Sequence, residues 1–305
     1  MTNVEKYRKY RLTKETKTLE DGTVLRRIRA TRDFILTDHS VVHKGNLGGW
    51  IEKEENLSHS ERAWVSCEAC VYGNARVCEN AYVGGGARVY ENATVYGDAY
   101  VADNARVYDR AKISENARVY GFAHVCGTSN VSGCAKVSGM SIVWGSASVH
   151  GHTHVLDNAN IFGDAIVSGS ADVYGNARVY GHAKVYGNSL IYENAEVLGD
   201  ARVYGFAEIC GDAKVSGIRD YATYKNTWSS GRYFTYTRSN KKWKVGCFFG
   251  TGEELIKKAY KDSKLSGKCY ETIVRTQESI DKMVSKEKYH DSVGSFRRRG
   301  REGSK

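Results

Sequence analysis

The stretch that decides the fold begins at Ala63 and reads AWVSCE, ACVYGN, ARVCEN, AYVGGG, ARVYEN, ATVYGD over residues 63–98. The same six-residue frame continues without a slip to the hexad that begins at Ala213, which makes 26 consecutive hexads. The third residue is Val or Ile in every hexad. The first residue is Ala in all but four hexads, which have Ser129, Ser141, Thr153 or Ser189.

This period predicts an all-β solenoid. A small residue and a β-branched residue two positions apart point to the same side of a short strand. The fifth and sixth residues are often Gly-Asn, Gly-Asp or Glu-Asn, which favour turns because Gly and Asn tolerate positive φ. Three strands and three corners close one coil of 18 residues, so valines 18 apart stack at about 4.8 Å. We therefore expect a parallel β-helix of nearly nine coils over residues 57–217.

The segments outside the frame predict three further parts. Residues 1–56 contain strand-like stretches and a turn at Asp21-Gly22, and we expect them to form a β-rich cap that covers the open strand edges of the first coil. Residues 218–290 predict a small α+β domain. Residues 291–305 have almost nothing to bury, and we expect a disordered basic tail there.

The predicted C-terminal domain begins with a β-hairpin. Its strands are RYFTYTR and KWKVGCF, which are joined by Ser239-Asn240-Lys241. Thr251 and Glu254 form a capping box that opens the first of two helices. The second helix is expected to start near Ser266.

The hexad pattern resembles the hexapeptide-repeat family, whose left-handed β-helix is best known from acyltransferases. The predicted handedness comes from that resemblance. The chain departs from the family pattern in the Tyr that often follows the Val. The first part of the chain is similar to the YdcK-type hexapeptide proteins of bacteria and prophages, which are labelled acetyltransferases by family. That similarity rests on Tyr10-Arg11-Leu12, Leu25-Arg26-Arg27-Ile28, Asp33-Phe34, Gly48-Gly49-Trp50, Asn56-Leu57-Ser58 and Trp64.

Charge and composition restrict the partners. The net charge is +10, but residues 219–305 hold 21 Lys and Arg against 10 Asp and Glu, whereas residues 1–218 hold 24 against 25. An unknown protein or anionic partner is therefore expected at the C-terminal domain. No apolar stretch approaches the roughly 20 residues that span a bilayer, and no signal peptide is evident, so we predict a cytoplasmic protein with no membrane partner. Cys67 and Cys70 lack a second cysteine pair, so no metal site is expected.

The resemblance implies an acyltransferase with a histidine general base and acetyl-coenzyme A as cofactor. The candidate bases would be His124, His150 and His154. The segment HGHTH around His152 straddles a corner, which disfavours a shared metal ion. The unbroken frame leaves no extruded loop to wall a coenzyme site, although a trimer could form a cleft between rods. We therefore expect no catalytic residue and no cofactor.

A candidate binding surface becomes visible when the residues at the fourth hexad position are grouped by the side of the rod on which they lie. Residues 18 positions apart belong to the same side. One side of the rod then carries an aromatic in six of eight places, and an exposed apolar stripe of this kind is normally an interface. It could contact a second copy in a dimeric or trimeric homo-oligomer, the C-terminal helices, a partner or a planar ligand. The stripe consists of Tyr72, Tyr90, Tyr108, Trp144, Phe162 and Tyr180.

The C-terminal hairpin interleaves aromatic and basic side chains. Such residues can stack on bases and neutralise phosphates, but they also occur in ordinary small β-domains. The residues concerned are Trp228, Arg232, Arg238, Lys241, Lys242 and Trp243.

Three functions follow from these patterns. The unbroken frame favours a non-catalytic scaffold or binding protein of the kind found in prophages. The alternative is a hexapeptide-class O- or N-acyltransferase, and a second alternative is a nucleic-acid or nucleotide binder. Fold alone does not decide among them.

Overall fold

The computed structural model describes residues 8–299, with side chains described through Ser285. The chain divides into two compact units, Met1–Asp220 and Tyr221–Lys305. The sequence places this boundary after residue 217.

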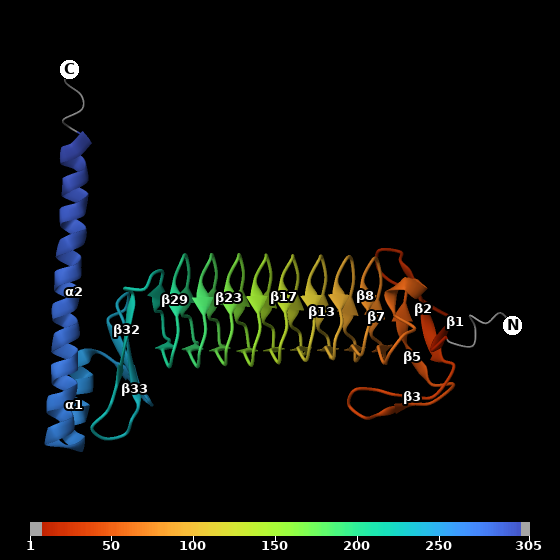
Figure 1. Ribbon diagram of the computed structural model, residues 1–305, viewed down its shortest axis with the longest axis horizontal. Coiled ribbons are helices and arrows are strands. Elements are labelled where there is room, and N and C mark those ends of the chain that lie inside the picture. Colours follow the sequence, from red (N-terminus) through yellow and green to blue (C-terminus); the bar gives the residue numbers. More distant parts are fainter. Residues whose placement is uncertain (1–7, 300–305) are drawn as a thin grey trace. The chain divides into compact units, whose positions relative to one another are not determined.

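The first unit contains the predicted β-solenoid of hexapeptide repeats (Figure 1). Each of its 26 strands covers the second and third residues of one hexad, from β6 (Trp64–Val65) to β31 (Lys214–Val215). Successive strands of the rod belong in turn to three sheets of 12, 8 and 9 strands, the first of which includes three strands of the cap. Within the rod, neighbouring strands of a sheet are parallel and lie 18 residues apart in the chain. The structure confirms the predicted all-β solenoid, and its form is of the left-handed type.

The interior of the rod is a dry column of small and β-branched side chains. Every third-position Val or Ile is at most 1% exposed, and so is every first-position residue. Thr153 Oγ1 has no hydrogen-bond partner among the described residues, but the other three hydroxyls that replace Ala donate to carbonyls. Ser129 Oγ donates to the Cys126 carbonyl at 2.7 Å, and Ser141 Oγ donates to the Ser138 carbonyl at 2.7 Å. Such bonds allow a polar group to remain inside an apolar column.

The corners contain an interaction that the hexad pattern does not reveal. The fifth residue has positive φ whether it is Gly or an acidic residue, for example 57° at Glu115. The acidic residues at this position accept a hydrogen bond from the backbone N–H one coil further on, as Glu115 does from Gly133 at 2.8 Å and Asp109 does from Gly127 at 2.8 Å. This bond offsets the cost of the left-handed conformation in a residue with a side chain.

The cap extends one sheet of the rod. Strands β1 (Tyr10–Thr18) and β2 (Val24–Ala30) pair antiparallel, β2 pairs antiparallel with β5 (Leu47–Ile51), and β5 pairs parallel with β7 (Cys70–Val71) of the rod. A Cβ on Gly48 would lie 2.7 Å from the Val65 carbonyl oxygen, and one on Gly49 would lie 2.6 Å from that of Ala69. The two glycines therefore let β5 approach the first coil closely.

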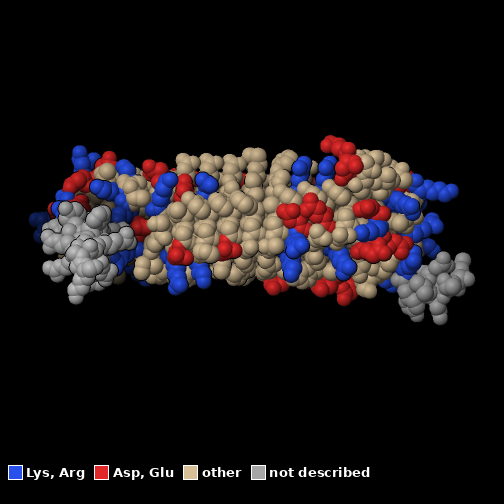
Figure 2. All heavy atoms as spheres, turned by 90° about the horizontal axis from the view of Figure 1, so that it is seen from above, with Lys and Arg blue, Asp and Glu red and all other residues tan. Residues whose placement is uncertain are grey.

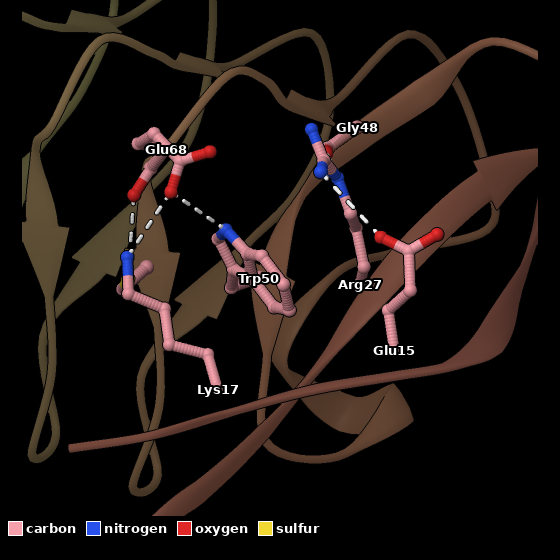
Figure 3. Close-up of polar contacts among 7 residues, drawn as sticks. Glu15, Lys17, Arg27, Gly48, Trp50 and Glu68 are labelled. Carbon is pink, nitrogen blue, oxygen red and sulfur yellow. Dashed lines mark hydrogen bonds and ion pairs between the residues drawn. The ribbon is translucent and has the colours of Figure 1, made fainter.

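Trp50 anchors the cap to the rod (Figure 3). Its indole N–H donates to the Glu68 carboxylate at 3.2 Å, and Lys17 forms an ion pair with the same carboxylate at 3.2 Å. Lys17 and Arg27 also lie over the indole ring, at 5.5 and 5.3 Å from its centroid. The ring is 8% exposed, so these cation–π contacts form where little water competes.

The cap also satisfies backbone groups that the end of a solenoid would leave unpaired. The fully buried ammonium of Lys9 donates to the carbonyls of Ser60, Glu61 and Ala63, the last at 2.6 Å. Burial, and then the charge of Arg32, lowers the pKa of Lys9 to about 7. A short 3₁₀ turn, Glu54–Asn56, completes the cap.

A hairpin arm leaves the cap between β2 and β5. It consists of β3 (Phe34–Ile35) and β4 (Val41–Val42), which pair antiparallel, and in Figure 1 it lies beside the first coils. The Thr37 hydroxyl donates to the Asn80 carbonyl at 3.1 Å, and the Phe34 ring packs edge-on against Trp64 at 5.2 Å. The arm is thus held against the surface of the rod.

The second unit is a four-stranded antiparallel meander with two helices. Its strands are β32 (Tyr221–Lys225), β33 (Tyr233–Thr237), β34 (Lys242–Val245) and β35 (Phe248–Gly250), and its helices are α1 (Gly252–Asp262) and α2 (Lys264–Arg299). The predicted β33–β34 hairpin and the Thr251–Glu254 capping box are both present. Over the described residues, neither helix is long and apolar enough to cross a membrane.

Helix α2 is longer than the sequence predicts. Residues 291–305 are expected to be a disordered tail, but α2 continues through Arg299. The chain contains no proline that would end the helix earlier. The remainder of the predicted tail, residues 300–305, lies outside the described residues.

The corner hydrogen bonds yield a matched pair of substitutions. Glu115→Ala removes the bond to Gly133 but keeps a Cβ at positive φ, so we expect the rod to lose about 1 kcal/mol of stability. Glu115→Gly removes the same bond but also relieves a left-handed strain of about 1 kcal/mol, so we expect little net change. Urea unfolding followed by far-ultraviolet circular dichroism measures both, and equal losses in the two variants would contradict this account.

Candidate functional site

A hollow on the rod lies between the hairpin arm and the nine-stranded sheet. Its volume is 140 Å³. Two further hollows adjoin it, and we call the three hollows together the arm groove. Tyr82 also lines a hollow of 290 Å³ toward the cap, and Tyr100 and Arg118 also line one of 280 Å³ along the rod. The central hollow is lined by Leu36, Thr37, Asp38, Asn80, Tyr82, Asp98, Ala99, Tyr100, Asn116 and Arg118.

Two stacked tyrosines form the floor of the arm groove. Tyr82 on β9 (Tyr82–Val83) and Tyr100 on β12 (Tyr100–Val101) have ring centroids 5.2 Å apart and planes 11° apart. A Cβ on Gly84 would lie 2.4 Å from the Tyr82 ring, so this ring extends along its own strand over a residue without a side chain. Tyr82 is half-buried, whereas Tyr100 is 38% exposed, and burial raises the pKa of both phenols.

The polar groups of the arm groove carry charges of both signs. Asp38 comes from the arm, and the Ser40 hydroxyl and N–H that bond to it lower the pKa of its carboxyl. Asp98 accepts a bond from the Asn80 side-chain amide at 3.0 Å. Arg118 is exposed, and no described carboxylate forms an ion pair with it. The central hollow therefore presents two carboxylates, one guanidinium and two amides around its tyrosines.

Sequence reasoning did not find these residues. The sequence predicts that the unbroken frame has no extruded loop, and the wall of the arm groove comes instead from the cap, outside the frame. A signal was nevertheless present at the second hexad position. Taking every eighteenth residue from Trp64 gives Trp64, Tyr82, Tyr100, Arg118 and Lys136, an aromatic run followed by two cations.

The predicted aromatic stripe is present as two separate ladders along the edge of the 12-stranded sheet. Tyr72, Tyr90 and Tyr108 stack at 5.1 Å, and Trp144, Phe162 and Tyr180 stack at 4.9 and 4.8 Å. Cys126 occupies the rung between the ladders.

The ring faces in these ladders are mostly occupied by neighbouring rings. Only Trp144 is exposed, at 42%, and its indole N–H donates to the Asn160 side chain at 2.9 Å. The Arg178 guanidinium lies over the rings of Phe162 and Tyr180 at 5.5 and 5.3 Å. A planar ligand therefore has little access to the ring faces, and the ladders offer edges to a partner instead.

The candidate catalytic histidines lie on three different sheets. His124 is on β16 (His124–Val125) of the 12-stranded sheet, His150 follows β20 (Ser148–Val149) of the eight-stranded sheet, and His154 is on β21 (His154–Val155) of the nine-stranded sheet. Burial, and then Arg106, lowers the pKa of His124. His154 Nδ1 lies 2.9 Å from Asp172 Oδ1. The three rings therefore do not converge on one site.

The described residues form no cluster of His, Cys, Asp and Glu that could hold a metal ion. Cys67 is exposed and Cys70 is buried, and both are free thiols. His152 is exposed at a corner.

The aromatic residues predicted to bind through the C-terminal hairpin belong mostly to its core. Trp243 is 2% exposed and packs with Phe234 and Val274, so it offers little surface to a ligand, although it borders a hollow of 580 Å³. The reason is the alternation of β34, which turns Trp243 toward the helices and Lys242 away from them. Trp228 is half-buried and packs edge-on against Tyr270 at 5.7 Å.

The predicted cations of the same hairpin differ in their contacts. Arg238 donates to Asp281 of α2 through Nε and Nη2 at 3.0 and 2.9 Å, and this pair fastens the helix to the sheet. Lys241 is exposed at a turn with φ of 53°, Lys242 is half-buried, and Arg232 is exposed. Of the six predicted residues, Arg238, Lys241 and Trp243 line one hollow of 580 Å³ beside α2. The other three do not line it: Trp228, Arg232 and Lys242.

Comparisons with family models and curated proteins identify no relative of this chain. No protein-family model matches the chain, and no curated protein matches it. The similarity to hexapeptide-repeat and YdcK-type proteins therefore stays a prediction from residue pattern. The geometry of the sites carries the functional argument.

Proposed function

We propose that this protein is a non-catalytic β-helical binding protein and scaffold, with the arm groove as its ligand site and the middle of the rod as a self-association surface. The observation that carries the proposal is the composition of the arm groove. The described residues that line its central hollow include no His or Cys, the usual bases and nucleophiles of acyl transfer. Concave sites with aromatic walls and a few placed polar groups are typical of ligand binding.

The positions of the histidines support a binding role over acyl transfer. Acyl transfer requires a base within hydrogen-bond reach of the acceptor and a wall that excludes water. His124 and His150 lie on the two sheets that do not carry the arm groove, and His154 lies two coils beyond Arg118 on the sheet that does. The wall and the candidate bases are therefore at different places.

The middle of the rod supports the scaffold part of the proposal. Residues 119–163 contain only two charged side chains, Lys136 and Asp157. On the face shown in Figure 2, uncharged side chains cover the middle of the rod, whereas charged ones lie on both sides of it. This region exposes large apolar side chains, which favours an interface. Their exposed fractions are 60% for Phe122, 62% for Met140, 37% for Ile142 and 42% for Trp144.

The non-catalytic part of the proposal predicts that acetyl-coenzyme A does not bind. Isothermal titration calorimetry with acetyl-coenzyme A should give no heat of binding, because the unbroken hexad frame has no extruded loop and the arm groove carries Asp38 and Asp98, whose charges repel the phosphates of the coenzyme. Micromolar affinity that disappears in His124→Ala, His150→Ala or His154→Ala would overturn the proposal in favour of an acyltransferase.

The scaffold part predicts that Trp144→Lys combined with Phe162→Lys dissociates the oligomer. Each large aromatic at a dry interface contributes about 2 kcal/mol or more, and buried ammonium groups add a desolvation cost. Light scattering measures the mass, and circular dichroism checks that the rod survives, since both side chains point away from the valine column. A monomeric wild-type protein, or an unchanged oligomer in the double variant, would exclude this surface.

A further inference from the structure

The floor of the arm groove repeats along the rod. Asn80, Asp98 and Asn116 occupy the sixth position of successive coils, and each is followed two residues later by Tyr82, Tyr100 or Arg118. Successive coils step by the strand spacing of about 4.8 Å. Each of these three coils therefore contributes one amide or carboxylate and, beside it, one aromatic ring or guanidinium to the floor. A ligand built from repeating units can make the same kind of contact at each step.

The charges of the groove disfavour a polyanion. Asp38 and Asp98 line the central hollow with only one cation, Arg118, and Asp103 joins Arg118 and Lys136 in the hollow further along the rod. A phosphate placed on Arg118 would lie in a hollow that also contains carboxylates, and like charges repel strongly where water is partly excluded. A nucleic acid is therefore poorly matched to this surface.

The same groups match a chain of hydroxylated rings. A sugar ring has a face of C–H groups, which packs on aromatic rings, and a rim of hydroxyls, which both donate and accept hydrogen bonds. Tyr82 and Tyr100 stack on each other, so they supply an apolar floor through their ring edges. Asp98 and Asp38 supply acceptors, and Arg118 supplies donors. The Asn80–Asp98 and Ser40–Asp38 bonds hold the acceptors in place before any ligand arrives, which reduces the entropy lost on binding.

From this arrangement we infer that the arm groove binds a neutral oligosaccharide chain, which runs along the rod over Tyr82 and Tyr100 beneath the hairpin arm. The inference rests on the proposed binding function and names its ligand class.

The test uses the full-length protein with maltohexaose, cellohexaose and chitohexaose as probes, and an oligouridylate of equal length as the anionic comparison. Saturation-transfer NMR detects binding, and calorimetry measures affinity. We expect at least one hexasaccharide to bind with submillimolar affinity. Tyr100→Ala should weaken that binding by about tenfold, because it removes one of the two rings that form the apolar floor. Arg118→Met, which keeps the aliphatic stem, should weaken it as well.

Tyr186→Ala is the matched control. Tyr186 is 37% exposed against 38% for Tyr100, and it likewise stacks on one tyrosine, Tyr204, at 5.5 Å. It lies on a different side of the rod, so its removal should leave the affinity unchanged.

Three results would overturn the inference: no binding by any hexasaccharide at millimolar concentration, equal loss in the Tyr100 and Tyr186 variants, or binding of the oligouridylate alone. In the last case, dependence on Tyr100 would keep the groove as a binding site and change only its ligand class. The acetyl-coenzyme A titration tests the proposed function separately, so the two failures can be distinguished.

Discussion

The backbone ladder between successive coils is the interaction on which the rest of this protein depends. Along most of the rod, the N–H of a residue donates to the carbonyl 17 positions further on, as Arg88 does to Ala105 and Tyr90 does to Val107. This ladder holds residues 18 apart side by side, so one insertion would move every following valine out of the column. The constancy of 26 hexads is what a ladder of this kind requires. The cap continues the same ladder through β5, and Lys9 satisfies carbonyls at the end where the ladder stops.

Because the interior is nearly the same in every coil, the differences between coils lie in the outward positions. Residues 18 positions apart at the second or fourth hexad position form a straight row along each sheet, which we call a track. The chemical character of a track is therefore set by every eighteenth residue. Most tracks carry residues that pair within the rod, as in the Tyr and Trp ladders. The track that begins at Trp64 differs because an arm from the cap lies beside it. Small residues such as Gly84 next to this track leave room for the tyrosine rings to extend along the strand.

The fold could be predicted from the sequence because its period is strict and local. The strand positions, the buried Val and Ala and the positive φ at the corners all follow from the hexad alone. The arm groove could not be predicted in this way, because the contacts of Thr37 with Asn80 and of Phe34 with Trp64 join segments outside the frame to the frame. The role of acidic residues at the corners was also missed, since Glu115 bonds to a residue one coil away and not to a neighbour in its own hexad. In the second unit, Trp243 belongs to the core because of helices whose packing on the sheet the hairpin sequence does not show.

The 18-residue register is the central claim, and disulfide mapping with one native cysteine tests it most directly. Cys70 and position 88 are register partners across β7 and β10 (Arg88–Val89). Neighbouring parallel strands are about 4.8 Å apart, which lies within the Cα separation that a disulfide can bridge. Under mild oxidation, Arg88→Cys should form a disulfide with Cys70 that peptide mass spectrometry identifies, whereas Arg106→Cys, one coil further, should not. A bridge from Cys70 in the Arg106 variant and none in the Arg88 variant would contradict the register, and with it the assignment of every track on the rod.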